Sequence, residues 1–347
     1  MKMNKEKHLA LYRKYRPESF DEVVGQDSIV SLLKTVVSQK KISHAYLFCG
    51  GRGTGKTTVA RILAKEIGCN SEDVIEIDAA SNRGIDEIRE LREAVRTAPF
   101  SSPYKVYIVD EVHMLTKEAA NALLKTLEEP PSHVVFILAT TDPQKLPQTI
   151  LSRCQIISFS EPDLETLTNQ IVKIAKNEGN DLSHKSAELI ASHGKGSYRD
   201  AYGVLEQILT QSHKKVDDDF VFSYLGNTDK AVIFSFLQGF CSKDAKEITR
   251  IISNEETSGK KAILFYDNVL ELLRKALLVR IGEKSSIKNF KEEDILILKK
   301  LGEDFPYVIS SKTIYELLSR YDTLKNSPQS LSWITLEAIF LSAFSTN

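Results

Sequence analysis

A glycine-rich segment at residues 50–57 constrains the fold of this 347-residue chain more than any other feature. It reads Gly-Gly-Arg-Gly-Thr-Gly-Lys-Thr, which matches the pattern G-x-x-x-x-G-K-[ST] of phosphate-binding loops. The apolar run 45–49 precedes it, and a helical pattern begins near Thr57. A strand, a glycine-rich turn and a helix in that order are the context that the motif requires. We therefore predict a site for the phosphates of a nucleotide.

The residue types of this loop suit that chemistry. Glycines let backbone N–H groups turn inward around phosphates, and the N-terminus of the following helix adds a partial positive charge. Lys56 is expected to reach the β- and γ-phosphates, and the Thr57 hydroxyl is expected to ligate Mg²⁺. The predicted nucleotide-binding residues of the loop are Gly50, Gly51, Arg52, Gly53, Thr54, Gly55, Lys56, Thr57 and Thr58.

A second apolar run, residues 106–109, ends in two acids, Asp110 and Glu111. This arrangement places Asp110 at the carboxyl edge of a sheet, where ligands of open α/β sheets bind. Asp110 is predicted to hold Mg²⁺ through water, and Glu111 to polarise an attacking water. Two acids at a strand end are weak evidence alone, but with the phosphate loop they favour hydrolysis. A phosphotransferase like adenylate kinase would not need the second acid.

Three further features have two interpretations each. Thr140 and Thr141 follow the run 134–138, where a hydroxyl can contact the γ-phosphate or the attacking water, or only cap a turn. Arg153 precedes the run 155–159 without an evident partner. Arg199 falls in the first turn of a helix that a Ser-x-x-Asp capping pattern begins, where a cation opposes the helix dipole by roughly 0.3–1 kcal/mol. A bound phosphate would reverse that sign, although a surface arginine is the commoner reading for both.

The hydrophobic pattern predicts an α/β fold in the first half of the chain. Five strands are expected, with helices between most of them, and this alternation predicts a parallel sheet with crossover helices. After about residue 161 only helical stripes occur, with turn residues near 226–228 and 254–259. The expected domains are 1–162, 163–226 and 227–347. The predicted strands are residues 45–49, 74–77, 106–109, 134–138 and 155–159.

Composition excludes several classes of protein. Lys and Arg number 46 against 47 Asp and Glu, so the formal net charge of −1 excludes a polycation that grips nucleic acid by bulk charge. A local basic face remains compatible with it. The four cysteines, at positions 49, 69, 154 and 241, form no C-x-x-C pair, so we expect neither a zinc site nor a disulfide framework. This pattern favours a protein of the reducing cytoplasm. Neither a signal peptide nor a membrane span is expected, because no apolar run is long enough.

The order and spacing of these motifs resemble the clamp-loader clade of the AAA+ ATPases, and more narrowly the gamma/tau subunits of bacterial DNA polymerase III. The resemblance covers most of residues 1–210 and is most specific from Asp110 to Cys154. It implies an AAA+ domain with a five-stranded parallel sheet, a small three-helix lid domain and an all-helical C-terminal collar. The matching segments are residues 12–26, 51–58, 73–91, 104–131, 138–155 and 196–201.

The resemblance also assigns roles to the ambiguous residues. It implies that Arg153 is an arginine finger that acts on ATP held by a neighbouring subunit. Arg199 resembles the second sensor, which contacts the γ-phosphate from the lid of the same subunit. Thr141 aligns with the first sensor, with Thr140 beside it. The segments around Tyr12 and Arg13, and around Val23 and Val24, resemble the part that packs around adenine.

The implied function is that of an ATP-hydrolysing motor subunit, which loads a sliding clamp onto primed DNA in the cytoplasmic replisome at the nucleoid. The implied partners are delta-like and delta-prime-like subunits, further copies of this chain, the clamp and primer-template DNA. DNA would be contacted through its phosphate backbone, with Arg83 or Lys117 as candidates. Two alternatives remain: a non-catalytic, delta-prime-like subunit, which an intact phosphate loop disfavours, and another AAA+ motor for branch migration or helicase loading. The Ser-Arg-Cys motif at 152–154 and the segment 123–131 disfavour the latter.

Two departures from the family pattern carry expectations. The family has a four-cysteine zinc module after the phosphate loop, but here Cys69 is followed directly by Asn-Ser-Glu-Asp-Val, so we expect no zinc. The sequence ends at Asn347, so the long C-terminal extension of the tau form is not expected to contribute contacts.

Overall fold

The computed structural model describes residues 9–82, 84, 90–91, 93–211, 216–225, 229–258, 260–282 and 292–344. The chain divides into two compact units, Met1–Val221 and Phe222–Asn347, which are described separately. The expected boundary between residues 162 and 163 falls inside the first unit. The division into three domains therefore stays a prediction.

The first unit contains a five-stranded parallel sheet with the strand order β2-β3-β4-β1-β5. Every residue of β1 and β4 is buried, which is typical of central strands covered on both faces. The predicted α/β class and the five predicted strands are confirmed, with the ends differing by one or two residues. The strands are β1 (Ala45–Cys49), β2 (Val74–Asp78), β3 (Lys105–Asp110), β4 (Val134–Thr140) and β5 (Gln155–Ser158).

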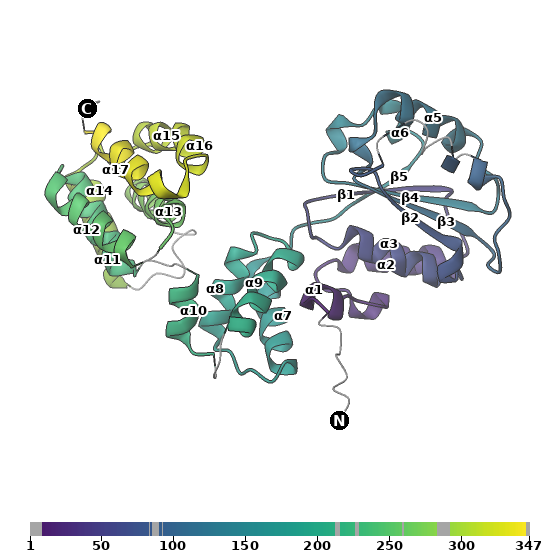
Figure 1. Cartoon of the computed structure of the whole chain (residues 1–347), viewed down its shortest axis with the longest axis horizontal. Helices are drawn as coiled ribbons and strands as arrows, with labels where there is room; N and C mark the ends of the chain where they lie inside the picture. Colours follow the sequence, from purple (N-terminus) through teal and green to yellow (C-terminus); the bar gives the residue numbers. More distant parts are fainter. Residues whose placement is uncertain are drawn as a thin grey trace. The chain divides into compact units, whose positions relative to one another are not determined.

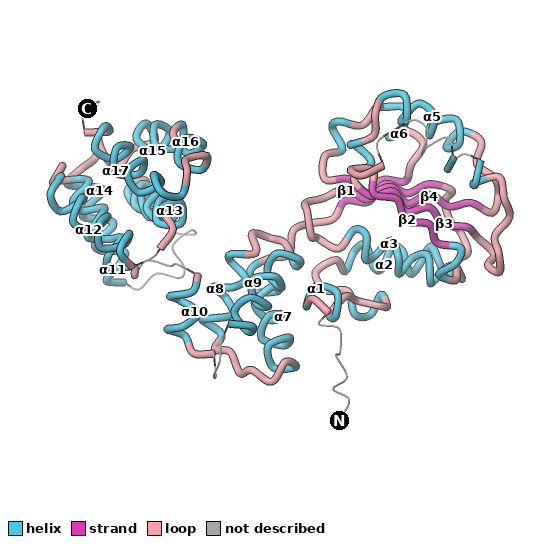
Figure 2. The backbone as a smooth tube through the Cα atoms, in the orientation of Figure 1, coloured by secondary structure: helices cyan, strands magenta, loops and turns pink. Residues whose placement is uncertain are grey.

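Helices cover both faces of this sheet (Figures 1 and 2). Apolar side chains of α2 (Asp27–Ser38) and α3 (Lys56–Glu66) form one core with the sheet. Those of α5 (Lys117–Glu128) and α6 (Gln148–Leu151) form the other. This sandwich fixes the carboxyl ends of the strands, where the site residues lie.

The limits of α5 follow from local chemistry. The Thr116 hydroxyl accepts a hydrogen bond from the backbone N–H of Ala119, which caps the N-terminus. Two prolines, at 130 and 131, follow the last turn and prevent the helix from continuing.

Helices alone make up the rest of the first unit's described residues after β5. Polar caps begin each of them: Asp163 before α7, Ser183 before α8, Ser197 before α9 and Asp217 before α10. Only half of the predicted capping box at α9 forms, because the N–H of Ser197 donates to the Gly194 carbonyl instead. These helices are α7 (Leu164–Asn177), α8 (His184–His193) and α9 (Tyr198–Gln211), with α10 (Asp218–Tyr224) containing the division between the units, and α1 (Leu11–Lys14) lies near the N-terminus.

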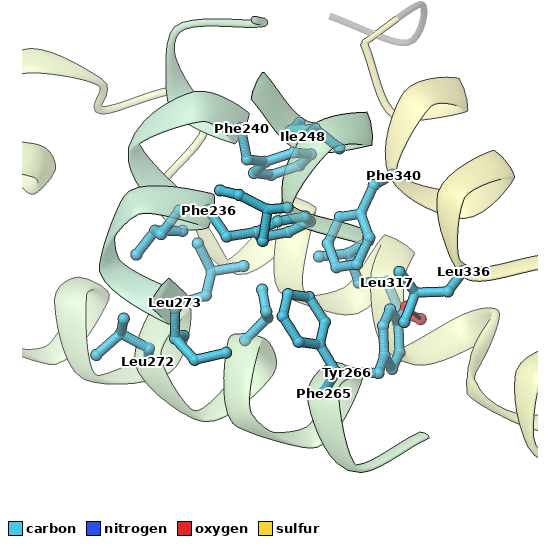
Figure 3. Close-up of a cluster of buried hydrophobic side chains, with 14 of the residues drawn as sticks. Phe236, Phe240, Ile248, Phe265, Tyr266, Leu272, Leu273, Leu317, Leu336 and Phe340 are labelled. Atoms are coloured by element: carbon cyan, nitrogen blue, oxygen red, sulfur yellow. Dashed lines mark hydrogen bonds between the residues drawn. The ribbon is translucent and has the colours of Figure 1, made fainter. Parts of the chain in front are cut away.

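Helices are the regular elements of the second unit's described residues, and aromatic rings pack among aliphatic side chains in its core (Figure 3). The Phe236 ring meets those of Phe265 and Phe340 edge-on, at centroid distances of 4.9 Å. Such edge-to-face pairs add to the stabilisation from area burial. The helices that follow α10 are α11 (Lys230–Cys241), α12 (Ala245–Thr257), α13 (Ala262–Arg280), α14 (Glu292–Asp304), α15 (Ser311–Ser319), α16 (Tyr321–Lys325) and α17 (Ser332–Ser342).

Two expected breaks in the helical pattern have different outcomes. The break expected to begin at residue 254 begins later, because α12 continues to Thr257. At the end of this helix the hydroxyls of Thr257 and Ser258 donate hydrogen bonds to carbonyl oxygens one turn earlier. The break expected near 226–228 lies outside the described residues. None of the described helices is long and apolar enough to span a membrane.

Candidate nucleotide-binding site

The loop between β1 and α3 has a backbone that side chains would obstruct. Gly53 lies in the left-handed region, with φ +72°, and a Cβ there would come within 2.0 Å of the Ser197 hydroxyl. At Gly50 a Cβ would come within 2.5 Å of the Phe159 carbonyl oxygen. The two glycines are therefore needed for close approach as well as for the turn itself.

Lys56, the first residue of α3, is held against this loop. Its side chain is 5% exposed, and Nζ donates to the carbonyl oxygens of Gly50 and Gly51 at 2.8 and 2.7 Å. Burial lowers the pKa of Lys56, and the nearby carboxylates of Glu111 and Asp110 oppose that shift. The ammonium group is thus fixed against the carbonyls of the loop, and its predicted contact with the β- and γ-phosphates stays a prediction.

Thr57 and Asp110 are directly joined. The Thr57 hydroxyl donates a 2.9 Å hydrogen bond to Asp110 Oδ2, across from the first turn of α3 to the end of β3. A hydroxyl and a carboxylate are oxygen ligands of the kind that Mg²⁺ prefers, with phosphate oxygens and water completing its octahedron. These residues therefore fit a magnesium ion bound together with a nucleotide.

Glu111 follows Asp110 in an unusual conformation. Its φ of +48° is left-handed, which is uncommon for a residue other than glycine, and strained backbone of this kind clusters at functional sites. Glu111 Oε2 accepts hydrogen bonds from the backbone N–H of Thr141 at 3.1 Å and from its hydroxyl at 2.9 Å. The Nδ1 atom of His113 lies 3.3 Å from the same oxygen.

The structure places the two predicted threonines in different surroundings. Thr141 contacts Glu111, as described above. The Thr140 side chain is fully buried, and its Oγ1 accepts from the Asp142 N–H at 3.0 Å and lies 2.9 Å from His113 Nδ1. Neither threonine lines the cavity described next, and the predicted contact of Thr140 with a nucleotide has no direct counterpart in the structure.

A cavity of about 860 Å³ collects most of the remaining predicted residues. It lies among the phosphate loop, α1 with the segment that follows it, α7 and the start of α9, and it reaches Asp110 and Glu111. Gly50 and Gly51 are absent from its lining, although their carbonyls hold Lys56. The predicted residues that line it are Tyr12, Val23, Val24, Arg52, Gly53, Thr54, Gly55, Lys56, Thr57, Thr58, Asp110, Glu111 and Arg199.

The guanidinium groups of Arg199 and Arg13 both lie near the Tyr12 ring, which lines this cavity. The Arg199 guanidinium carbon is 5.0 Å from the centroid of the Tyr12 ring, and that of Arg13 is 5.7 Å from the same centroid. These are cation–π distances. Arg199, from the first turn of α9, and Tyr12, from α1, are therefore brought together at the site.

Sequence reasoning missed one wall of the cavity. Gln170, Lys173, Ile174 and Asn177 of α7 line it at the spacing i, i+3, i+4, i+7. This spacing puts them on one helix face. A mostly polar stripe on a helix is typical of a solvent-exposed face. The only signal in the sequence was therefore the helical spacing that puts these four residues on one face of α7.

Known proteins show which family combines these features. A family model described as "DNA polymerase III, delta subunit" matches residues 25–83 and 70–163. The DNA polymerase III subunit gamma of Buchnera aphidicola subsp. Schizaphis graminum is 37% identical, over 85% of this chain and 87% of that protein. The DNA polymerase III subunit tau of Bacillus subtilis is 37% identical, over 95% of this chain and 61% of that protein. The chain belongs to the gamma/tau subunit family of DNA polymerase III.

This gamma/tau-family chain is shorter than the tau subunits that it matches, and its fold is similar to that of a solved motor protein. It spans 61% of the Bacillus subtilis tau subunit and 46% of the tau subunit of Escherichia coli. Among solved structures, the Thermotoga maritima RuvB Holliday junction branch migration motor matches with a TM-score of 0.52 and 21% identity, over 65% of this chain and 78% of that one. At that identity the likeness shows the fold alone, which is the AAA+ fold expected of the family.

Arg153, predicted in the family context to act on a neighbour, does not line the cavity of its own chain. It follows α6, its side chain is 32% exposed, and its Nη2 lies 2.6 Å from Glu128 Oε1 at the end of α5. Its Nη1 also donates to the Thr149 carbonyl at 2.9 Å. Lys117 is exposed at the start of α5, and Arg83 lies outside the described residues.

The chain after Cys69, where the family pattern predicts a zinc module, is tied to the turn before β3. The Cys69 thiol lies 3.1 Å from the Tyr104 carbonyl oxygen, and the Asp73 carboxylate accepts three hydrogen bonds from backbone N–H groups of residues 100–102. Within the described ranges no group of three or more His, Cys, Asp or Glu side chains could hold a metal ion. The absence of zinc stays a prediction.

Proposed function

We propose that this chain is an ATP-hydrolysing motor subunit of a clamp loader, which places a sliding clamp on primed DNA during replication. The observation that supports it best is the convergence of Lys56, Thr57, Asp110 and Glu111 on one cavity. These four residues supply the cation, metal ligands and acid that hydrolysis of a nucleoside triphosphate requires. Membership of the gamma/tau family supports the replication role.

Each side chain has a defined task in this proposal. Lys56 binds the β- and γ-phosphates, while Thr57 and Asp110 hold Mg²⁺, which neutralises phosphate charge when bound. Glu111 orients and polarises the attacking water, with its carboxylate fixed by the N–H and hydroxyl of Thr141. Arg199 approaches the γ-phosphate from α9, after exchanging the Tyr12 ring for the nucleotide. Tyr12, Arg13, Val23 and Val24 enclose the base.

Arg153 completes the site of a neighbouring copy or partner subunit in this proposal. Its exposure and its absence from the cavity of its own chain support a role in trans. An arginine supplied to a γ-phosphate contributes about 10³–10⁵ in rate. Hydrolysis then depends on assembly, because each site lacks this charge until a neighbour docks.

The remaining parts of the proposal concern assembly and DNA. The domains are proposed as 1–162, 163–226 and 227–347, and the last forms a collar that holds copies of this chain together with delta-like and delta-prime-like subunits in the cytoplasm. Lys117 and Arg83 are candidates for contacts to DNA phosphates. Binding through phosphates weakens steeply with salt.

ATP turnover of the assembled complex tests the site. The chain is combined with its partner subunits, its clamp and primed DNA, and ATP binding and turnover are measured separately. Lys56→Ala is expected to abolish binding and turnover, and Glu111→Gln to retain binding while turnover falls by about 10²–10⁴-fold. Lys65→Ala, at the exposed end of the same helix, is the matched control.

Different outcomes distinguish the alternatives. Full DNA-stimulated turnover with Lys56→Ala would show that hydrolysis occurs on another subunit, as expected of a non-catalytic, delta-prime-like role. Retention of a labelled clamp on primed circular DNA tests loading itself. Turnover without clamp retention would exclude the clamp-loader role and leave another AAA+ motor activity.

A further inference from the structure

We propose that His113 is a positioning residue that holds the Glu111 carboxylate in the orientation needed to act on water. The inference rests on the proposed function, because it requires Glu111 to polarise the attacking water. His113 lies in the 3-10 turn Val112–Met114, directly after the acidic pair, and its side chain is 9% exposed. Neither the loop motif nor the family resemblance assigned it a role.

The contacts of His113 join two strand ends. Its Nδ1 lies 2.9 Å from Thr140 Oγ1 and 3.3 Å from Glu111 Oε2. Thr140 is the last residue of β4, and Glu111 follows the last residue of β3. One ring atom therefore lies close to the carboxyl ends of two neighbouring strands. The ring therefore fixes the distance between the acid and the end of β4.

The same carboxylate oxygen receives every contact. Glu111 Oε2 accepts hydrogen bonds from the N–H and the hydroxyl of Thr141, and His113 Nδ1 lies 3.3 Å from the same oxygen. Within the part of the chain that the structure describes, no donor bonds Oε1. One oxygen is thus anchored while the other remains available to accept a hydrogen bond from water.

The partners of Nδ1 determine which tautomer His113 must have. A carboxylate oxygen can only accept, so a bare Nδ1 lone pair would face Oε2 without a hydrogen between them. With the hydrogen on Nδ1, the ring donates a hydrogen bond to Thr140 Oγ1 and turns its polar N–H toward Glu111 Oε2, which lies 3.3 Å from Nδ1 and is attracted to it electrostatically. The hydroxyl oxygen of Thr140 has two lone pairs, and the Asp142 N–H uses the other one at 3.0 Å. The buried Thr140 hydroxyl therefore orients the ring instead of contacting the nucleotide.

A loosened carboxylate is expected to slow the chemical step more than binding. Glu111 has three side-chain torsions and a left-handed backbone conformation. We therefore expect its carboxylate to adopt several orientations when one of its contacts is removed. Small displacements of a catalytic group can cost up to about 100-fold in rate. Lys56 and the phosphate loop, which do not contact His113, keep their contacts with the nucleotide.

Three substitutions at His113 separate the hydrogen bond from the space that the ring fills. His113→Asn places an amide nitrogen near the position of Nδ1, His113→Gln places it near Nε2 instead, and His113→Ala removes both. The full chain is assembled with partner subunits, clamp and primed DNA. We expect the Ala and Gln variants to lose about 10- to 100-fold in kcat while KM and the Kd for ATP change less than about threefold. The Asn variant is expected to stay within about threefold of the native kcat.

The outcomes distinguish this proposal from the one on which it rests. If Glu111→Gln keeps full turnover, the proposed role of Glu111 is wrong. If Glu111→Gln is inactive but all three His113 variants match the native kcat, the positioning role is overturned. If Asn is as impaired as Ala, the assignment of the Nδ1 contact is overturned. In the full chain labelled with ¹⁵N-histidine, NMR should show His113 protonated at Nδ1; hydrogen on Nε2 alone would overturn it even if a variant fails to fold.

Discussion

The Tyr198 hydroxyl donates a 2.8 Å hydrogen bond to the carbonyl oxygen of Val24, joining the start of α9 to the segment that encloses the candidate nucleotide site. The Tyr198 N–H donates to the Gly53 carbonyl in the phosphate loop at 3.1 Å. Burial raises the pKa of Tyr198 to about 12, so the hydroxyl stays protonated and able to donate at neutral pH. One residue of α9 therefore bonds to both the loop and the base-side segment.

Tyr198→Phe removes this hydroxyl and keeps the ring. We expect the free energy of unfolding to fall by about 0.5–1.5 kcal/mol, because one hydrogen bond between distant segments is lost. ATP affinity should fall severalfold, since Val24 is no longer held against α9. Urea unfolding and ATP titration measure the two effects. Tyr307→Phe, at an exposed tyrosine of the second unit, is the control, and an equal loss of affinity in both variants would contradict a specific role for the Tyr198 bond.

The Tyr198–Val24 bond also shows why part of the site was beyond the sequence. The phosphate loop, Asp110 and Glu111 were predictable because short local patterns encode a strand, a tight turn and a helix start. Val24 and Tyr198 are 174 positions apart, and only the packed fold brings them together. The pair of Arg153 with Glu128 is hidden in the same way, since neither residue type specifies its partner.

Alternation along a strand explains the ambiguity at the end of β4. Successive residues there face opposite directions, so Thr140 and Thr141 occupy different surroundings although they are chemically identical. The residue types alone left a phosphate contact and a turn cap open at this point, and the family resemblance aligned Thr141 with the first sensor. Which one touches Glu111, and that His113 holds the other, depends on the register of β4 beside β3 and on the left-handed turn at Glu111.

Phe236→Ala tests the aromatic core of the second unit. Phe236 is 0% exposed and packs edge-on against Phe265 and Phe340, so its loss leaves a cavity. We expect the free energy of unfolding to fall by about 3–5 kcal/mol. Trp333, the only tryptophan of the chain, lies 5.8 Å from Phe265 and reports unfolding of this unit by fluorescence.

Ile334→Ala is the control for Phe236→Ala. Ile334 is 61% exposed on α17, beside the reporting tryptophan in the sequence, and an exposed truncation usually changes stability by less than about 0.5 kcal/mol. A midpoint shift as large as that of Phe236→Ala would show that the fluorescence change does not report the core.

Asp73→Asn tests the turn that follows Cys69. Burial would raise the pKa of Asp73, but hydrogen bonds from the Ser102 side chain and from the N–H groups of Phe100, Ser101 and Ser102 outweigh it and lower the pKa to about 2. Because the folded pKa lies below the ordinary value, the carboxylate stabilises the fold above about pH 4, and the contribution is lost as the pH falls from about 4 to 2.

Urea midpoints of the native chain and Asp73→Asn, measured from about pH 7 down to about pH 3, give the expected pattern. The variant should unfold at lower urea near pH 7, and the gap should narrow as the pH falls below about 4. Asp78→Asn is the comparison, since Asp78 is the last residue of β2, the strand that begins directly after Asp73. A gap for Asp73→Asn that is constant across the whole range would mean that the charge of Asp73 contributes nothing.

Arg153→Ala tests whether the arginine acts on a neighbouring subunit. The ion pair with Glu128 is partly exposed, so its loss should cost no more than about 1 kcal/mol of stability, and ATP binding by the variant should be native. Turnover by the assembled complex should fall by about 10³-fold or more, because the γ-phosphate loses a stabilising cation. Glu128→Gln, which keeps an acceptor for the guanidinium, is the control and should retain turnover.

Mixing the Arg153→Ala and Lys56→Ala chains is decisive: an intact loop then meets an intact arginine at some interfaces, and turnover should partly recover. If the arginine acted within its own chain, every copy in the mixture would be defective and no turnover would return.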